Sequence, residues 1–168
     1  FRGGLQKPVI RRPRRFVGWG CRKAKHMSFK ISDKCIGCSV CKKICPMACI
    51  TGERGKHHKI DEALCIECKA CGYICPQSAV VDARNHFIER IRFRKNWPKP
   101  VIDKTRCISC VICLDSCPVG CLELSYTRDP ADQKGFPLLA DERTCIACEF
   151  CAADCPVNAI QMTGPAET

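Results

Sequence analysis

Short apolar runs recur along the chain, separated by cysteine-rich loops and polar turns. In the first part of the chain these runs are Phe29–Ile31, Ile50–Thr51, Lys59–Ile60 and Val80–Val81. In the second part they are Val101–Ile102, Leu122–Tyr126, Leu138–Leu139 and Ile160–Met162. Apolar runs of this length predict short β-strands, and the turn Gly52-Glu53-Arg54-Gly55 predicts a hairpin. The order predicts an α+β unit of strand, cysteine loop and helix, hairpin, cysteine loop and helix, and strand, built twice.

Sixteen of the 19 cysteines follow one pattern, C-x2-C-x2-C-x3-C-P, which occurs four times. The copies are Cys35-Cys38-Cys41-Cys45, Cys65-Cys68-Cys71-Cys75, Cys107-Cys110-Cys113-Cys117 and Cys145-Cys148-Cys151-Cys155. This is the run with which bacterial ferredoxins bind [4Fe-4S] clusters, three thiolates on one cluster and the fourth on another. Four copies therefore predict four [4Fe-4S] clusters.

The spacing predicts which cysteines share a cluster. Three cysteines two residues apart wrap one cluster, and a short helix then carries the fourth cysteine away, with a proline directly after it. Pairing neighbouring motifs assigns Cys35, Cys38, Cys41 and Cys75 to cluster 1 and Cys65, Cys68, Cys71 and Cys45 to cluster 2. It assigns Cys107, Cys110, Cys113 and Cys155 to cluster 3 and Cys145, Cys148, Cys151 and Cys117 to cluster 4.

Other interpretations of these cysteines are weaker. A structural zinc ion takes two C-x2-4-C pairs and gives no reason for a third cysteine at constant spacing. A disulfide framework is typical of short secreted chains, whereas no apolar signal segment lies near the start of this one. A radical-SAM site needs a C-x3-C-x2-C triplet, which does not occur.

Three cysteines and a histidine pair lie outside the motifs. Cys49 and Cys121 occupy a position where the other two copies of the repeat have alanine, which predicts a small buried packing site. Cys21 stands alone near the start and has no assigned role. His57 and His58 belong to the first hairpin, where we expect solvent-exposed side chains without a role.

We divide the chain into an N-terminal arm (1–27), a first ferredoxin-like domain (28–81), a linker (82–100) and a second ferredoxin-like domain (101–168). Aromatic residues make up only 7% of the chain, so each domain is too small to be stabilised by apolar burial alone. We expect the clusters to serve as the core, and cluster binding to supply much of the folding free energy.

The linker interleaves basic and aromatic residues. We favour a structured linker with aromatics packed over the clusters above a nucleic-acid contact.

Charge is distributed unevenly along the chain. The formal net charge is +11, yet residues 1–30 contain ten Lys or Arg and no Asp or Glu. Residues 31–100 have 13 basic and 7 acidic side chains, a net +6, and residues 101–168 have 5 and 10, a net −5. We expect the arm to dock on an acidic partner subunit, ahead of anionic lipid and, last, nucleic acid. No apolar run reaches membrane-spanning length, so we expect a cytoplasmic protein that touches a membrane at most peripherally.

From Ser28 to Met162 the four motifs resemble the bacterial 2[4Fe-4S] ferredoxin family twice over. The resemblance implies a polyferredoxin-like subunit of a larger anaerobic redox enzyme, in a hetero-oligomer with a hydrogenase, aldehyde oxidoreductase, formate dehydrogenase or carbon monoxide dehydrogenase. The alternative is a small subunit that contributes to a catalytic centre at a subunit interface. Since the sequence contains no dinucleotide or phosphate loop and no H-E-x-x-H motif, we favour an electron relay without a substrate of its own.

Overall fold

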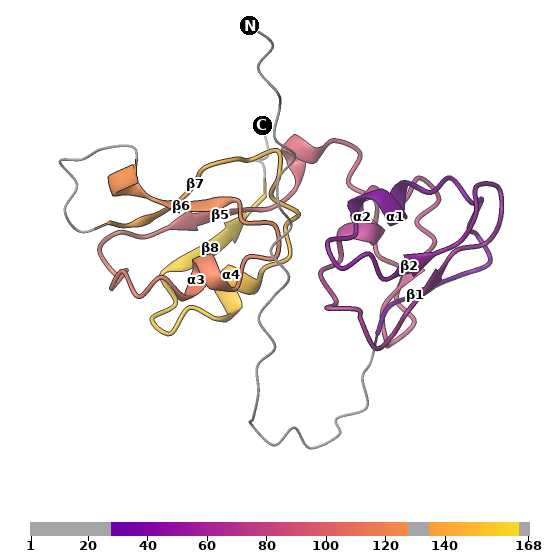
Figure 1. Cartoon of the computed structure of the whole chain (residues 1–168), viewed down its shortest axis with the longest axis horizontal. Coiled ribbons are helices and arrows are strands. Elements are labelled where there is room, and N and C mark those ends of the chain that lie inside the picture. Colours follow the sequence, from indigo (N-terminus) through magenta and orange to yellow (C-terminus); the bar gives the residue numbers. More distant parts are fainter. Residues whose placement is uncertain (1–27, 128–134, 165–168) are drawn as a thin grey trace, which may run out of the picture.

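The protein has an α+β fold of short elements, seen in a computed structural model that describes residues 28–127 and 135–164 (Figure 1). In the N-terminal half the elements are β1 (Lys30–Ile31), α1 (Val40–Ile44), β2 (Ile50–Thr51), β3 (Lys59–Ile60), α2 (Ala70–Ile74) and β4 (Val80–Val81). A 3-10 turn, η1 (Arg94–Asn96), follows. The C-terminal half contains β5 (Lys99–Ile102), α3 (Ile112–Asp115), β6 (Leu122–Leu124), η2 (Ser125–Thr127), β7 (Pro137–Leu139), α4 (Phe150–Ala153) and β8 (Ile160–Thr163). The predicted arm, Cys21 and most of the second hairpin loop lie outside the described residues.

The same strand pairing occurs in both halves. In each half the first strand pairs antiparallel with the last and the two middle strands form a hairpin, which gives β1–β4 with β2–β3 and β5–β8 with β6–β7. Figure 1 shows the two groups of elements side by side, the first in indigo to magenta and the second in orange to yellow. The strands lie where the apolar runs predicted them, with some ends shifted.

Two predicted strand ends were wrong by two residues, and the starts of β1 and β7 and the end of β8 were wrong by one. The strand expected from Val101 begins at Lys99, because residues 99–102 all pair with β8. The strand expected to reach Tyr126 ends at Leu124, where the chain turns into η2. There the Tyr126 ring lies against Gly135, whose left-handed φ of 65° and missing Cβ allow this close approach.

Each helix is short because its two ends are fixed by the cysteine motif. All four begin directly after a residue with left-handed φ, and α1 and α2 end at an extended cysteine, Cys45 or Cys75, that precedes a proline. Proline forces the residue before it out of the helical region, so the fourth cysteine of the motif leaves the helix axis. The motif thus determines where its last thiol can reach.

Buried thiols form much of the core in both halves. The first core contains Phe29, Ile50 and Val80 together with four cysteines, and the second contains Leu122 and Ile160 together with four more. A core in which cysteines outnumber hydrocarbon side chains excludes little apolar surface from water. This composition agrees with the expectation that bound clusters complete the core.

The segment that joins the halves is ordered and short. Residues 82–88 fold back on β4, where Asp82 N donates to His86 O at 2.9 Å and Ile88 N donates to Val80 O at 2.9 Å. Only residues 89–98 cross between the halves. Trp97 is 0% exposed in the packing between them, whereas Phe87 and Phe93 are 47% and 52% exposed. The expectation that linker aromatics are packed is therefore right for Trp97 and wrong for both phenylalanines.

None of the helices within 28–127 and 135–164 has the length and apolar character needed to cross a membrane.

Candidate metal centres

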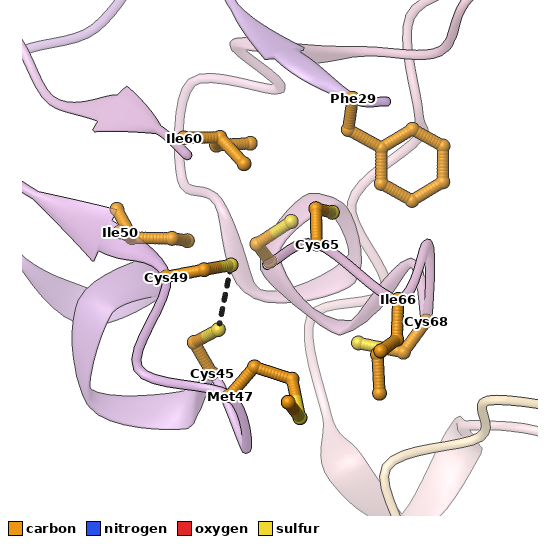
Figure 2. Close-up of a pocket in the computed structure, with 10 residues that line it drawn as sticks. Phe29, Cys45, Met47, Cys49, Ile50, Ile60, Cys65, Ile66 and Cys68 are labelled. Carbon is orange, nitrogen blue, oxygen red and sulfur yellow. Dashed lines mark hydrogen bonds between the residues drawn. The ribbon is translucent and has the colours of Figure 1, made fainter. Parts of the chain in front are cut away.

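Within the described residues, four cavities are each lined by four motif cysteines. Cys45, Cys65, Cys68 and Cys71 line one (Figure 2), and Cys35, Cys38, Cys41 and Cys75 line a second. In the C-terminal half, Cys117, Cys145, Cys148 and Cys151 line a third, and Cys107, Cys110, Cys113 and Cys155 line a fourth. About 300 to 340 Å³ lies between the atoms at each site, and this space includes some that is open to solvent. Every cavity thus brings three cysteines of one loop together with the last cysteine of the neighbouring motif.

Left-handed residues at two repeated positions wrap each loop around its cavity. They precede and follow the second cysteine of each motif, with φ between 55° and 69°: Gly37 and Ser39, Glu67 and Lys69, Ser109 and Val111, Ala147 and Glu149. Such alternation turns successive backbone N–H groups toward one side, which creates a concavity suited to an anionic group. The conformation costs roughly 1–2 kcal/mol for a residue with a side chain. That strain is typical of a functional loop.

The fourth cysteine of most motifs is oriented by the backbone four residues later. Ala79 N donates to Cys75 Sγ at 3.3 Å, and Ala159 N donates to Cys155 Sγ at 3.2 Å. Cys121 N makes the same contact with Cys117 Sγ at 3.5 Å. These N–H groups hold the sulfur atom of the fourth cysteine in a fixed direction.

The geometry tests the competing interpretations of the cysteines. All 18 described cysteines are free thiols, which contradicts a disulfide framework in this part of the chain. Among the described residues no three His, Cys, Asp or Glu side chains converge tightly enough to hold a single metal ion. Four thiolates on one zinc ion would lie about 3.8 Å apart. A cube with one iron at each of four corners holds its thiolates farther apart, so these cavities fit a [4Fe-4S] cluster better than a single ion.

Comparison with protein families supports this assignment. A 4Fe-4S dicluster domain matches residues 106–159, a second dicluster domain matches residues 64–122, and a 4Fe-4S binding domain matches residues 32–51. This chain is a ferredoxin-type iron–sulfur protein. The match over 64–122 takes one cysteine loop from each half, whereas the cavities join loops within one half.

Sequence comparison finds no match among curated proteins. One solved structure similar to this ferredoxin-type chain is a chain of the formate dehydrogenase–heterodisulfide reductase–formylmethanofuran dehydrogenase complex from Methanospirillum hungatei, with 23% identity and a TM-score of 0.32. The alignment covers 77% of this chain and 52% of that one, so the chain spans about half the length of the structure it matches.

Burial favours the protonated form of several thiols of the ferredoxin-type chain when no metal is bound. Removal from water raises the pKa of Cys41, Cys68, Cys113 and Cys148 to about 11 and that of Cys151 to about 12. A bound cluster must displace these protons, so cluster assembly releases protons and is favoured at higher pH. Cys117 and Cys145 differ, because the neighbouring Cys121 thiol, which can donate its one proton to either of them at a time, lowers the pKa of each below its usual range.

The two additional cysteines lie against candidate ligands. Cys49 Sγ is 3.4 Å from Cys45 Sγ, and Cys121 Sγ is 3.5 Å from Cys117 Sγ. Both side chains are buried, as are the alanines in the equivalent positions, so the predicted small packing site is confirmed. The sulfur contacts were not predicted from sequence. Their signal was the fixed spacing of four residues after the last cysteine of the motif.

His58 was also misjudged from sequence. Its side chain is 0% exposed and lines the cavity of Cys35, Cys38, Cys41 and Cys75, whereas a solvent-exposed turn was expected. His58 Nε2 lies 3.1 Å from Ser39 Oγ, and Nδ1 lies 3.0 Å from Lys56 O. Gly52 allows the ring to enter, because a Cβ there would come within 2.8 Å of His58 Cγ. His57 remains exposed, as expected.

One cysteine loop from each half meets the other in the packing between the halves. Cys68 and Ala70 share a core with Ile146 and Ala147, and Trp97 fills its centre. Lys69 Nζ reaches Glu149 Oε2 at 3.1 Å across this contact. Burial is the main cause that raises the pKa of Cys68, and the charges of Cys45 and Cys148 add to it. Two of the four cavities therefore face each other between the halves.

Proposed function

We propose that this chain relays single electrons through four [4Fe-4S] clusters held in two tandem dicluster domains. The ligand sets are Cys35, Cys38, Cys41 and Cys75 for cluster 1, Cys65, Cys68, Cys71 and Cys45 for cluster 2, Cys107, Cys110, Cys113 and Cys155 for cluster 3, and Cys145, Cys148, Cys151 and Cys117 for cluster 4. The observation that carries the proposal is the lining of four separate cavities by these same four sets.

The packing supports a linear order of the clusters. Clusters 1 and 2 exchange their fourth ligands within one half, and clusters 3 and 4 do so within the other. The loops of clusters 2 and 4 meet around Trp97. The proposed path is therefore 1–2–4–3, with clusters 2 and 4 as the crossing point and clusters 1 and 3 at the ends.

The chain's own residues provide three things for this function. The buried thiols bind the clusters, the left-handed loop residues shape the backbone around them, and the apolar cavity walls restrict water. When bound, each cluster supplies one-electron redox chemistry at a potential set by its ligands, hydrogen bonds and exposure. The protein controls electron transfer mainly by how close it holds one cluster to the next.

The partner is a catalytic redox subunit in a hetero-oligomer, of the hydrogenase, aldehyde oxidoreductase, formate dehydrogenase or carbon monoxide dehydrogenase type. The ferredoxin resemblance supports this proposal. The ten basic and no acidic residues of 1–30 support docking of the arm on an acidic surface of that partner.

Anaerobic reconstitution of the full chain tests the proposal. The holo-protein should contain about sixteen irons, four per cluster, and should accept and donate single electrons in a dithionite titration followed by EPR. It should not turn over NADH, hydrogen, formate, carbon monoxide or aldehydes without a partner. Sustained turnover of any of these by the isolated chain would contradict a pure relay.

A further inference from the structure

The two outer cavities, those of clusters 1 and 3, have the same construction but different walls. Ser39 and Val111 are equivalent, since each follows the second cysteine of its loop. His58 and Pro137 are equivalent by strand register, because Ile60 pairs with Ile50 as Leu139 pairs with Leu122. Ser39 and His58 line the cavity of cluster 1, and Val111 and Pro137 line that of cluster 3. Gln77 and Val157, each two residues after the fourth cysteine of its set, differ in the same way. Polar wall residues in one half thus replace apolar wall residues in the other, and Ser39 and His58 form a hydrogen-bonded pair among them.

The polar pair is fixed in position by hydrogen bonds. A carbonyl oxygen can only accept, so the 3.0 Å contact with Lys56 O places a proton on His58 Nδ1, which donates. In the neutral ring Nε2 then accepts from the Ser39 hydroxyl at 3.1 Å. The imidazole is fully buried, so bulk water does not screen the interaction of its dipole, or of the hydroxyl dipole, with the charge of a cluster bound in the cavity.

Solvent access to the ligands does not distinguish the two cavities. In each set the first, second and fourth cysteines are partly exposed and the third is buried: Cys35, Cys38, Cys75 and Cys41 in one, and Cys107, Cys110, Cys155 and Cys113 in the other. The exposure of the ligands, which also affects the potential of such clusters, is therefore of the same kind at the two sites. The wall residues are the local difference that remains.

Reduction adds one negative charge to a cluster, and the groups around the cluster determine the free energy of this step. Placing an added charge beside apolar groups costs more free energy than placing it beside polar groups, whose dipoles replace part of the lost hydration. The formal charge of each half also favours reduction of cluster 1 over cluster 3, since residues 31–100 carry a net +6 and residues 101–168 a net −5. We propose that the Ser39–His58 pair gives cluster 1 a higher reduction potential than cluster 3, so that electrons collect at the cluster 1 end of the relay.

This inference rests on the proposed relay and gives it a direction. Electrons pass downhill from the acidic C-terminal half to the basic N-terminal half. A donor is then expected at the cluster 3 end and an acceptor at the cluster 1 end. Ser39 and His58 act as positioning residues that adjust the potential without binding the cluster.

The test is an EPR-monitored redox titration of the reconstituted full chain with variants in both outer cavities. Ser39→Ala combined with His58→Phe removes the polar pair and keeps an aromatic ring in the buried site. We expect this variant to make reduction of one cluster less favourable by roughly tenfold, the low end of what a charge loses when an apolar group replaces a polar neighbour in a buried site. For one electron this corresponds to about −59 mV. The cluster that shifts should be the one whose signal is altered by Cys35→Ser.

Two further variants keep the test decisive. Val111→Ser introduces a hydroxyl in the other outer cavity and should raise the potential of the cluster altered by Cys107→Ser. His57→Phe changes the exposed neighbour of His58 and should shift nothing. The proposal is overturned if cluster 1 has the lower potential of the two, or if cluster 1 keeps its wild-type potential in the double variant Ser39→Ala with His58→Phe. Failure of the relay itself would show differently, as fewer than four reducible clusters in the unmodified chain.

Discussion

The inner and outer cysteine loops share one motif and one backbone geometry, yet they face different surroundings. In the inner loops, those of clusters 2 and 4, Ala70 and Ile146 are buried against the other half. In the outer loops, Ile36 and Ile108 are 56% and 62% exposed. The difference teaches that the motif encodes the cluster site, whereas the residues between its cysteines determine what each loop contacts.

The residue after the second cysteine shows this most clearly. It is Lys69 in one inner loop and Glu149 in the other, and the two form an ion pair between the halves. In the outer loops it is Ser39 or Val111, and neither belongs to the packing between the halves. The residue at this position of the repeat therefore joins the two halves in the inner loops, whereas in the outer loops it lines a cavity.

Removal of iron should have the largest effect, because it acts on inner and outer sites together. Cysteines form more than half of each core, so we expect the apoprotein to lose its fixed tertiary structure. Anaerobic treatment with an iron chelator, followed by near-UV circular dichroism, measures this. An apoprotein that keeps a cooperative thermal transition would contradict the view that the clusters complete the core.

Loss of Trp97 should separate the halves while their clusters remain. The ring is fully buried, stacks edge-on against Tyr73 at 5.5 Å, and donates from Nε1 to Ile91 O at 3.0 Å. Trp97→Ala should cost about 3–5 kcal/mol at this contact. We expect small-angle scattering to show a larger radius of gyration, with iron content unchanged. Phe93→Ala is the matched control, since Phe93 is half exposed, and it should have little effect.

The ion pair between the inner loops should have the smallest effect. The Lys69 and Glu149 side chains are 42% and 41% exposed, so solvent screens the pair and its contribution is about 0.2–1 kcal/mol. Lys69→Glu should lower the unfolding midpoint slightly, and the charge swap Lys69→Glu with Glu149→Lys should restore it. Equal losses in the single and double variants would show that the two side chains do not interact.

Much of this architecture was predictable from sequence, because it depends on local chemistry. The strand positions follow from short apolar runs, and the grouping of cysteines within each cavity follows from the spacing of motifs. The burial of His58 was not predictable, since it requires Gly52 to admit a ring from the opposite strand. Which two cysteine loops meet between the halves was not predictable either. It depends on the path of residues 89–98 and on where Trp97 packs, and neither produces a periodic pattern in the sequence.

The crossed fourth ligand is the central claim, and the variant Cys45→Ser tests it most directly. Cys45 belongs to the first motif, yet it lines the cavity of Cys65, Cys68 and Cys71. Iron content and EPR of the reduced protein should show that Cys45→Ser perturbs the same cluster as Cys65→Ser. The double variant should be no worse than either single one. Cys49→Ala, which places at this site the alanine found at Ala79, should keep all four clusters. If Cys45→Ser instead perturbs the cluster altered by Cys35→Ser and leaves that of Cys65→Ser intact, the ligands are not crossed and the account is wrong.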